Sequence, residues 1–151
     1  MIPVGREEDP SPLAEARSRS GNPDSYEING EVYYVLDSAE GYDQEGYASW
    51  YGEQFAGRPT SSGEIFDPEL LSAAHRSLPL PTWVEVTNLD NGHQIRLRVN
   101  DRGPFSDPSR RIIDVSEAAA RRLGLIGPGI ARVRVRALRV DELRGGEAPR
   151  P

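Results

Sequence analysis

Among the side chains suited to proton transfer, Glu64, His75 and Asp101 lie on three separate elements of one small domain. Two carboxylates and an imidazole can serve general acid–base chemistry if the fold brings them together. Each residue also has a simpler interpretation. Asp101 lies in the string Asn100-Asp101-Arg102-Gly103-Pro104, which is typical of a turn. Glu64 can be a solvated loop residue, and His75 a hydrogen-bonded, partly buried histidine.

Composition excludes several other chemistries. The 151 residues include no Cys, and all 18 basic residues are Arg. Disulfides, thiolate zinc sites, cysteine nucleophiles, Schiff-base lysines and Walker-type phosphate loops are therefore excluded. Because His75 and His93 are the only histidines, we predict no metal site, and we expect no cofactor. No basic stripe with interleaved aromatic residues is present, so we expect no nucleic-acid partner.

Charge is unevenly distributed along the chain, whose net charge is −6. Residues 1–45 contain 3 Arg and 11 acidic residues, whereas residues 46–139 have a net charge of +3. The first 24 residues lack apolar periodicity, as does the end of the chain. We predict a flexible acidic arm over 1–24, one folded domain with its lead-in segment over 25–139, and a flexible tail over 140–151.

Short runs with a period of two predict half-buried strands. They cover residues 31–36, 46–51, 82–87, 94–99 and 131–136. Asn91-Gly92 lies between the third and fourth runs and is a strong signal for a hairpin. The sheet is therefore expected to be at least partly antiparallel.

Two short helices are predicted between the strands. Asp67 and Pro68 are suited to begin a helix over the string PELLSAAHRS, and His75 would then share the inward face of Leu71. Ser116 and Gly124 are suited to begin and end a second helix. Many short strands around one core predict a small barrel, which has no exposed sheet edges.

Two aromatic residues in the second strand run have two interpretations. Trp50 and Tyr51 can be core residues, or they can form a platform on which a sugar stacks. By contrast, Arg132, Arg134 and Arg136 alternate with valines and are typical of a solvated sheet face.

Four strings in order along the chain resemble the rare lipoprotein A family of bacterial septal lytic transglycosylases. They are GYASWYGEQFAGRPTSSGEIFD, LSAAHRSLPLPTWVEVTNLDNG, IRLRVNDRGPF and RIIDVSEAAARRLGL. The resemblance extends from about Tyr26 to Leu138. It implies an all-β fold, a six-stranded double-psi β-barrel with two or three short helices.

The resemblance also implies an activity and its residues. The expected reaction is endolytic cleavage of the β-1,4 bond between N-acetylmuramic acid and N-acetylglucosamine in glycan strands without stem peptides, with a 1,6-anhydromuramic product. Asp101, Glu64 and His75 match the catalytic residues of the family. Further residues expected to bind substrate are Trp50, Tyr51, Thr60, Asn100 and Arg102. Ser61 departs from the pattern, which has Ala at that position.

Location and partners follow from the same resemblance. It implies a periplasmic protein of cell division and cell-wall remodelling, anchored as a lipoprotein in the outer membrane, although the lipid-bearing Cys is absent from this sequence. Peptidoglycan glycan strands are the expected partner, with septal cell-division proteins as a further candidate class, and we expect a monomer. Two alternatives remain: a non-catalytic peptidoglycan-binding module using the same groove, and a glycoside hydrolase that admits water.

Overall fold

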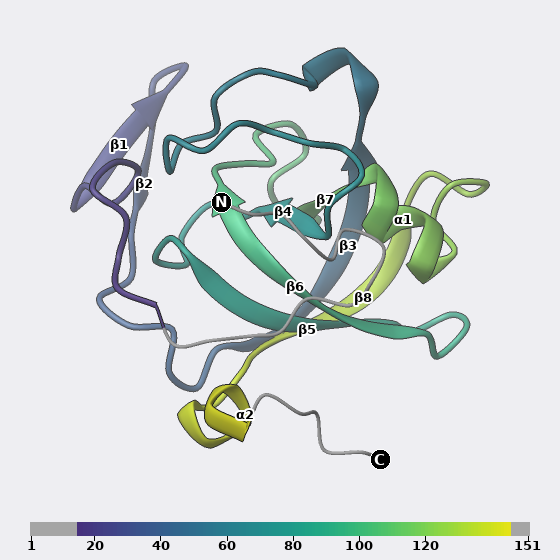
Figure 1. The fold of residues 1–151 in the computed structure, drawn as a ribbon. Helices are drawn as coiled ribbons and strands as arrows, with labels where there is room; N and C mark the ends of the chain where they lie inside the picture. Colours follow the sequence, from purple (N-terminus) through teal and green to yellow (C-terminus); the bar gives the residue numbers. More distant parts are fainter. Residues whose placement is uncertain (1–14, 146–151) are drawn as a thin grey trace.

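The computed structural model of the chain describes residues 15–145 (Figure 1). Strands dominate this part of the chain, as the alternating runs predict. The elements in chain order are β1 (Ser25–Ile28), β2 (Glu31–Tyr34), β3 (Asp43–Tyr51), the 3₁₀ helix η1 (Glu53–Phe55), β4 (Ser72–Ala74), β5 (Thr82–Asn88), β6 (Gln94–Asp101), β7 (Arg111–Ser116), α1 (Glu117–Leu123), β8 (Ala131–Ala137) and α2 (Val140–Gly145).

Six of the strands close into a barrel with the order β3-β7-β4-β6-β5-β8. The pairs β3–β7 and β4–β6 are parallel, and the other four pairs are antiparallel. Closure leaves none of these six strands with an unpaired edge. The closed six-stranded barrel expected from the resemblance is therefore confirmed.

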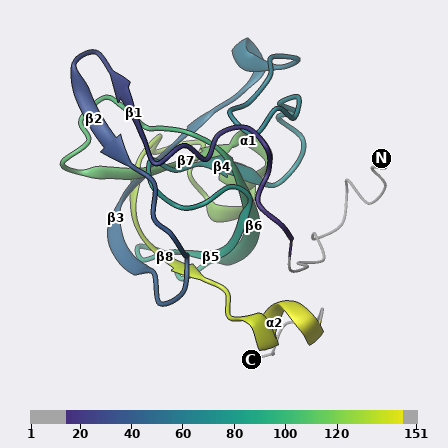
Figure 2. The ribbon, with the colours of Figure 1, turned by 90° about the vertical axis from the view of Figure 1, so that its left-hand side faces the viewer.

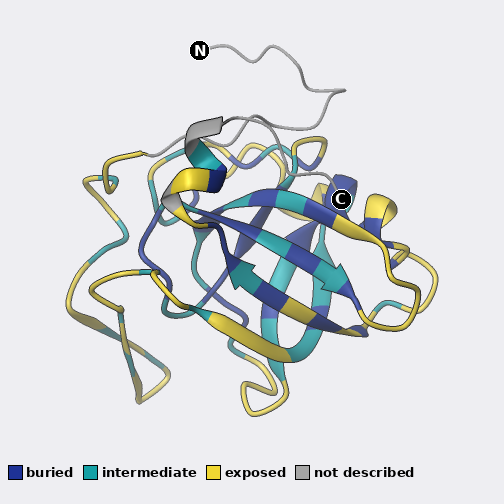
Figure 3. Cartoon of the chain, turned by 90° about the horizontal axis from the view of Figure 1, so that it is seen from below, coloured by how far each residue is buried: buried dark blue, intermediate teal, exposed yellow. Residues whose placement is uncertain are grey.

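The core of the barrel is built from the side chains that face inward, which are every second residue along a strand. In β8, Val133 and Val135 are fully buried, whereas the alternating Arg132 and Arg134 point outward. Those arginines pair with acids of the neighbouring strand: Arg134 contacts Asp43 at 2.5 Å, and Arg132 contacts Glu45 at 2.9 Å. Figure 3 shows the resulting alternation of buried and exposed residues along the strands. Period-two patterning thus fixes which face of each strand enters the core.

The hairpin signal at Asn91-Gly92 is confirmed, because β5 and β6 pair antiparallel around it.

The predicted helix over residues 68–77 is wrong. Asp67 instead forms a turn, in which its carboxylate accepts from the Glu69 amide at 2.9 Å. The chain then enters β4, whose three small residues are all buried between β6 and β7. The hydrogen bonds and burial available in the barrel outweigh the local helix signal. The period-two pattern also failed to predict strand β7.

The second predicted helix is confirmed as α1. The Ser116 hydroxyl accepts from the Ala119 amide at 3.3 Å and so caps the first turn. Gly124 ends the helix with φ of 78°, a left-handed conformation that favours glycine. Among residues 15–145 no helix is both long and apolar enough to cross a membrane.

Hairpin β1–β2 stands outside the barrel (Figure 2). Two of its aromatic rings reach the loop after β6: the centroids of Tyr33 and Phe105 lie 5.4 Å apart, and those of Tyr26 and Phe105 lie 6.2 Å apart. The Tyr26 hydroxyl also donates to the Arg76 carbonyl at 2.7 Å. The hairpin is therefore attached to the barrel beside the residues that follow Asp101.

Residues 15–24 contact the barrel, which differs from the flexible arm expected over 1–24; residues 1–14 lie outside the described part. Asn22 accepts from the Leu80 amide and donates to the Leu80 carbonyl, both at 2.8 Å. Gly21 has φ of 88°, and a Cβ there would meet the Ser61 carbonyl oxygen at 2.7 Å. The segment therefore packs closely against the loop that contains Ser61.

Replacing Asn22 by Ala is expected to lower the free energy of unfolding by about 1–2 kcal/mol, because two backbone groups of Leu80 lose a partner. The measurement is urea unfolding, with the exposed Gln54→Ala as a control expected to stay within about 0.5 kcal/mol of the original protein. Equal stability of the two variants would mean that the segment adds nothing to the barrel.

Part of the expected flexible tail also has structure. Residues 140–145 form α2, and Glu142 is buried and pairs with Arg136 at 2.9 Å. Hydrogen bonds from Arg136 hold the pKa of Glu142 at about 2, although burial opposes this shift. Residues 146–151 lie outside the described part. Folded structure therefore continues beyond residue 139.

Candidate active site

An open groove of about 340 Å³ lies at the end of the barrel where β6 ends. The long loop between η1 and β4 passes over this end (Figure 1). Aromatic rings make up much of the wall, and the Tyr51 and Phe66 rings stack with centroids 4.6 Å apart. The lining residues are Tyr51, Phe55, Arg58, Pro59, Phe66, Ala74, Asp101, Arg102, Phe105 and Asp114. Two carboxylates thus share an aromatic-walled groove, a combination suited to a sugar ligand.

Asp101 is held at the end of β6 by three hydrogen bonds. The backbone amide and the hydroxyl of Ser61 each donate to Oδ1 at 2.9 Å, and the Arg102 amide donates to the same oxygen at 2.8 Å. The hydroxyl bond depends on Ser61, because an alanine at this position would supply the backbone amide alone. All three donors reach Oδ1, so Oδ2 is the oxygen available to exchange a proton with a ligand.

Asp114, on β7, is the second carboxylate of the groove. Arg111 Nη2 donates to its Oδ1 at 2.6 Å, and the Ser49 hydroxyl donates to the same oxygen. An arginine at this distance forms a charge-assisted hydrogen bond with the carboxylate. Sequence reasoning missed Asp114, because it lies within the string RIIDVS, a strand that was itself not predicted.

Tyr51 brings an unsatisfied hydroxyl to the groove. This oxygen is buried, and within residues 15–145 it has no hydrogen-bond partner. Burial raises the pKa of Tyr51, and the negative charges of Asp101 and Asp114 raise it further. The hydroxyl therefore stays protonated and can donate to a bound ligand.

Glu64 lies outside the residues that line the groove, in an ion pair beside it. Its two oxygens accept from Arg98 Nη1 at 2.6 Å and Nη2 at 2.7 Å, and Asn100 donates at 3.0 Å. Arg98 also binds Glu15, at 2.8 Å. The hydrogen bonds from Arg98 lower the pKa of Glu64, against the opposing effect of burial. Glu64 is therefore ionised, with 39% of its side chain exposed.

Residues 43–135 match the protein family described as lytic transglycolase. The chain belongs to the lytic transglycolase family. The match begins at the first residue of β3 and ends within β8, so it covers the barrel and every residue that lines the groove. The double-psi β-barrel predicted from the sequence is thereby confirmed.

Curated relatives of this lytic transglycolase domain include two bacterial proteins named endolytic peptidoglycan transglycosylase RlpA. The Vibrio cholerae protein is 47% identical over 135 residues, which are 89% of this chain and 50% of the relative. The Pseudomonas aeruginosa protein is 46% identical over 137 residues, which are 91% of this chain and 39% of the relative. The chain thus spans half or less of the length of these relatives.

Solved structures with a similar barrel include two proteins of low identity. Streptomyces papain inhibitor is 24% identical with a TM-score of 0.55, over 68% of this chain and 100% of that one. Clavibacter michiganensis expansin in complex with cellohexaose is 20% identical with a TM-score of 0.50, over 65% of this chain and 51% of that one. At these identities the likeness concerns the fold alone.

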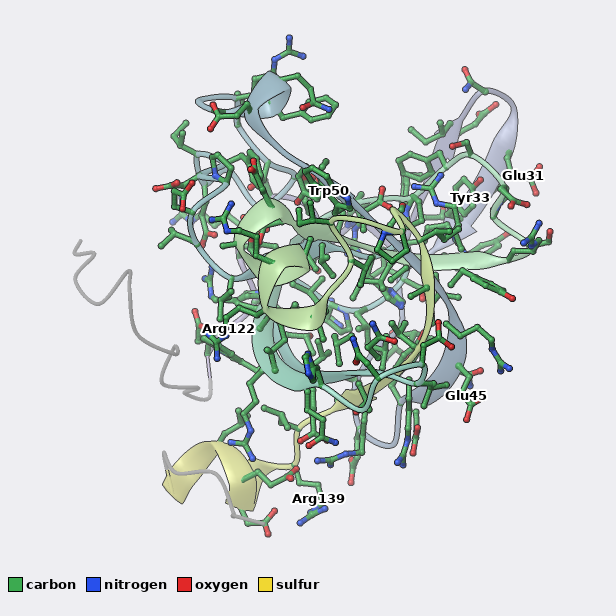
Figure 4. All side chains as sticks on the ribbon, turned by 90° about the vertical axis from the view of Figure 1, so that its right-hand side faces the viewer. Glu31, Tyr33, Glu45, Trp50, Arg122 and Arg139 are labelled. Atoms are coloured by element: carbon green, nitrogen blue, oxygen red, sulfur yellow. The ribbon has the colours of Figure 1, made fainter. Side chains whose placement is uncertain are left out.

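Three of the four other residues expected to bind substrate lie around the groove of this lytic transglycolase domain rather than in it. Trp50 is half-buried against the core and lies beside α1 (Figure 4). Thr60 donates to the Glu64 carbonyl at 2.9 Å and so shapes the loop. Asn100 holds Glu64, as described above, and its own Oδ1 is buried without a partner in the described part. Arg102 lines the groove.

His75 is buried beneath the site, following strand β4 rather than lying on a helix. Its Nδ1 accepts from the Ser77 and Leu78 amides, both at 3.1 Å, and its Nε2 lies 2.8 Å from the Tyr42 hydroxyl. Both ring nitrogens are therefore engaged, and Nε2 must hold the ring proton. The His75 amide also donates to the Asp101 carbonyl at 3.0 Å. This bond connects the histidine to the acid through the backbone.

Acidification should weaken the fold through His75. Burial, aided by the charges of Arg76 and Arg102, lowers the pKa of His75 from 6.5 to about 3. The unfolded chain therefore binds a proton below pH 6.5 that the folded chain does not bind until about pH 3. The contribution of neutral His75 to the free energy of unfolding is therefore lost as the pH falls. Between pH 7 and pH 5 the free energy of unfolding should decrease by about 2 kcal/mol.

Urea unfolding at pH 7 and pH 5 measures this loss. His75→Gln should flatten the dependence on pH, whereas the exposed His93→Gln should retain it. Unchanged pH dependence in His75→Gln would mean that another group is responsible. Nowhere in the described part do three or more His, Cys, Asp or Glu side chains gather as a metal site would require.

Proposed function

We propose that this domain cleaves the β-1,4 bond between N-acetylmuramic acid and N-acetylglucosamine in peptidoglycan strands without stem peptides, leaving a 1,6-anhydromuramic end. One observation carries the proposal: Asp101 and Asp114 line one aromatic-walled groove in a member of the lytic transglycolase family. The names of the two curated relatives support an endolytic reaction on peptidoglycan.

In the first step Asp101 acts as the general acid. Its Oδ2 proton passes to the glycosidic oxygen as the bond from that oxygen to the muramic C1 breaks, and positive charge develops on the muramic ring. The Asp114 carboxylate, paired with Arg111, stabilises this charge across the groove. The Tyr51 hydroxyl donates to a sugar oxygen in the same groove.

In the second step Asp101 acts as the base. Its carboxylate removes the proton of the C6 hydroxyl of the same muramic ring, and the C6 oxygen forms a bond to C1. No water is consumed, and Asp101 regains its proton for the next cycle. Glu64, ionised at the edge of the groove, orients the glycan, and His75 positions Asp101 through the backbone hydrogen bond between them.

Cell division and cell-wall remodelling are the proposed setting. An enzyme that acts on peptidoglycan must lie outside the cytoplasmic membrane, and we propose that this domain lies in the periplasm. We also propose that the full-length protein is anchored to the outer membrane by a lipid. Septal cell-division proteins are proposed as partners, and the domain is proposed to act as a monomer without a cofactor.

Mass spectrometry of a digest of peptide-free glycan tests the reaction. Anhydromuramic ends are the expected result. Reducing ends would indicate hydrolysis, and intact glycan that is retained by the protein would indicate a binding module. Either of these outcomes would contradict the proposed function.

A further inference from the structure

Arg58 lines the groove and has no counter-charge among residues 15–145. It lies in the loop after η1, where its amide donates to the Phe55 carbonyl at 3.1 Å and its carbonyl accepts from the Phe66 amide at 2.8 Å. Its guanidinium carbon lies 5.6 Å from the centroid of the Phe55 ring. Both the backbone and the side chain are thus supported, although the residue is exposed.

The other charged groups of the groove already have partners. Arg102 donates to the carbonyls of Gly21 at 2.7 Å and Leu78 at 2.6 Å, so its guanidinium holds the fold together. Asp101 and Asp114 accept the hydrogen bonds described above. Within residues 15–145, Arg58 forms no ion pair. Its N–H groups therefore remain available to an anionic ligand.

We infer that Arg58 binds the free lactyl carboxylate of the muramic ring under attack, and that this contact selects strands without stem peptides. The inference rests on the proposed function. The lactyl group is attached to C3 of the same ring whose C1 reacts at Asp101, so it lies within the same groove. A planar guanidinium matches a carboxylate with two parallel hydrogen bonds. A stem peptide converts that carboxylate into an amide, which has no charge to offer Arg58.

Arg58→Gln tests the inference with two substrates that differ only at the lactyl group. One is glycan with free lactyl carboxylates, and the other is the same glycan after its carboxylates are converted into methyl amides. The original protein should prefer the free acid by about tenfold in kcat/KM, the size of one charge-assisted hydrogen bond, mainly through KM. In Arg58→Gln the preference should nearly disappear.

Arg110→Gln is the matched control. Arg110 is also an exposed arginine, 5.1 Å from the Tyr47 ring centroid, but it does not line the groove. This variant should keep the preference for the free acid. Melting temperatures of both variants report whether the fold is intact.

Two outcomes would overturn the inference: an original protein that treats both glycans alike, or an Arg58→Gln variant that keeps the preference. Binding of the two glycans is measured in parallel by pull-down. If the original protein cuts neither glycan, the proposed reaction fails. The pull-down then still tests the role of Arg58. The original protein should bind the free-acid glycan better than the amide, and Arg58→Gln should lose that preference.

Discussion

Asp101→Asn is expected to lower the rate of glycan cleavage by about 10²–10⁴-fold, the contribution of a general acid–base group. Asn keeps the shape of the side chain and can still accept from Ser61 and from the Arg102 amide, but it has no proton to give to the glycosidic oxygen. Binding should therefore largely survive. The measurement is the rate at which anhydromuramic ends form, together with a pull-down on peptide-free peptidoglycan.

Asp107→Asn is a suitable control, because Asp107 is exposed in the loop after β6 and outside the groove. It should cleave glycan at the original rate. A well-folded Asp101→Asn protein with nearly full activity would remove Asp101 from the mechanism. If Asp101→Asn loses its fold, as judged from its melting temperature, Asp101 is a structural turn residue.

Asp114→Asn is expected to lower cleavage by about 10²–10³-fold, a loss typical of removing one preorganised electrostatic group. Asn can still accept from Ser49 and Arg111, so the fold should remain. The variant lacks the negative charge that stabilises the developing cation on the sugar. Rates are measured on the same glycan, with melting temperatures as the check on folding.

Glu64→Gln separates the two carboxylates that flank Asp101. Glu64 lies beside the groove and shares Arg98 with Glu15, so its loss should cost only about tenfold, an effect on orientation comparable to one hydrogen bond. A larger loss in Glu64→Gln than in Asp114→Asn would assign charge stabilisation to Glu64 instead. The order of the two effects is therefore the decisive result.

Local patterning determined much of the barrel. Alternation in Gln94–Val99 and in Ala131–Arg136 predicted two strands, because successive side chains of a strand must point to opposite faces. The caps of α1 were also evident, since Ser116 and Gly124 satisfy backbone groups within one turn of the helix. The string Asn100-Asp101-Arg102-Gly103-Pro104 likewise marked the end of a strand, because these residue types favour turns.

Only the tertiary structure decided β4 and the composition of the site. Ser72–Ala74 is too short to show a period, and it becomes a strand because β6 and β7 supply its hydrogen bonds. The pairing of β7 with β3 brings Asp114 beside Ser49. Barrel closure brings Asp114 into the same groove as Asp101, whereas Glu64 remains beside it with Arg98 and the His75 ring is buried against Tyr42. Strand register and barrel closure set these positions, and both depend on contacts between residues far apart in the chain.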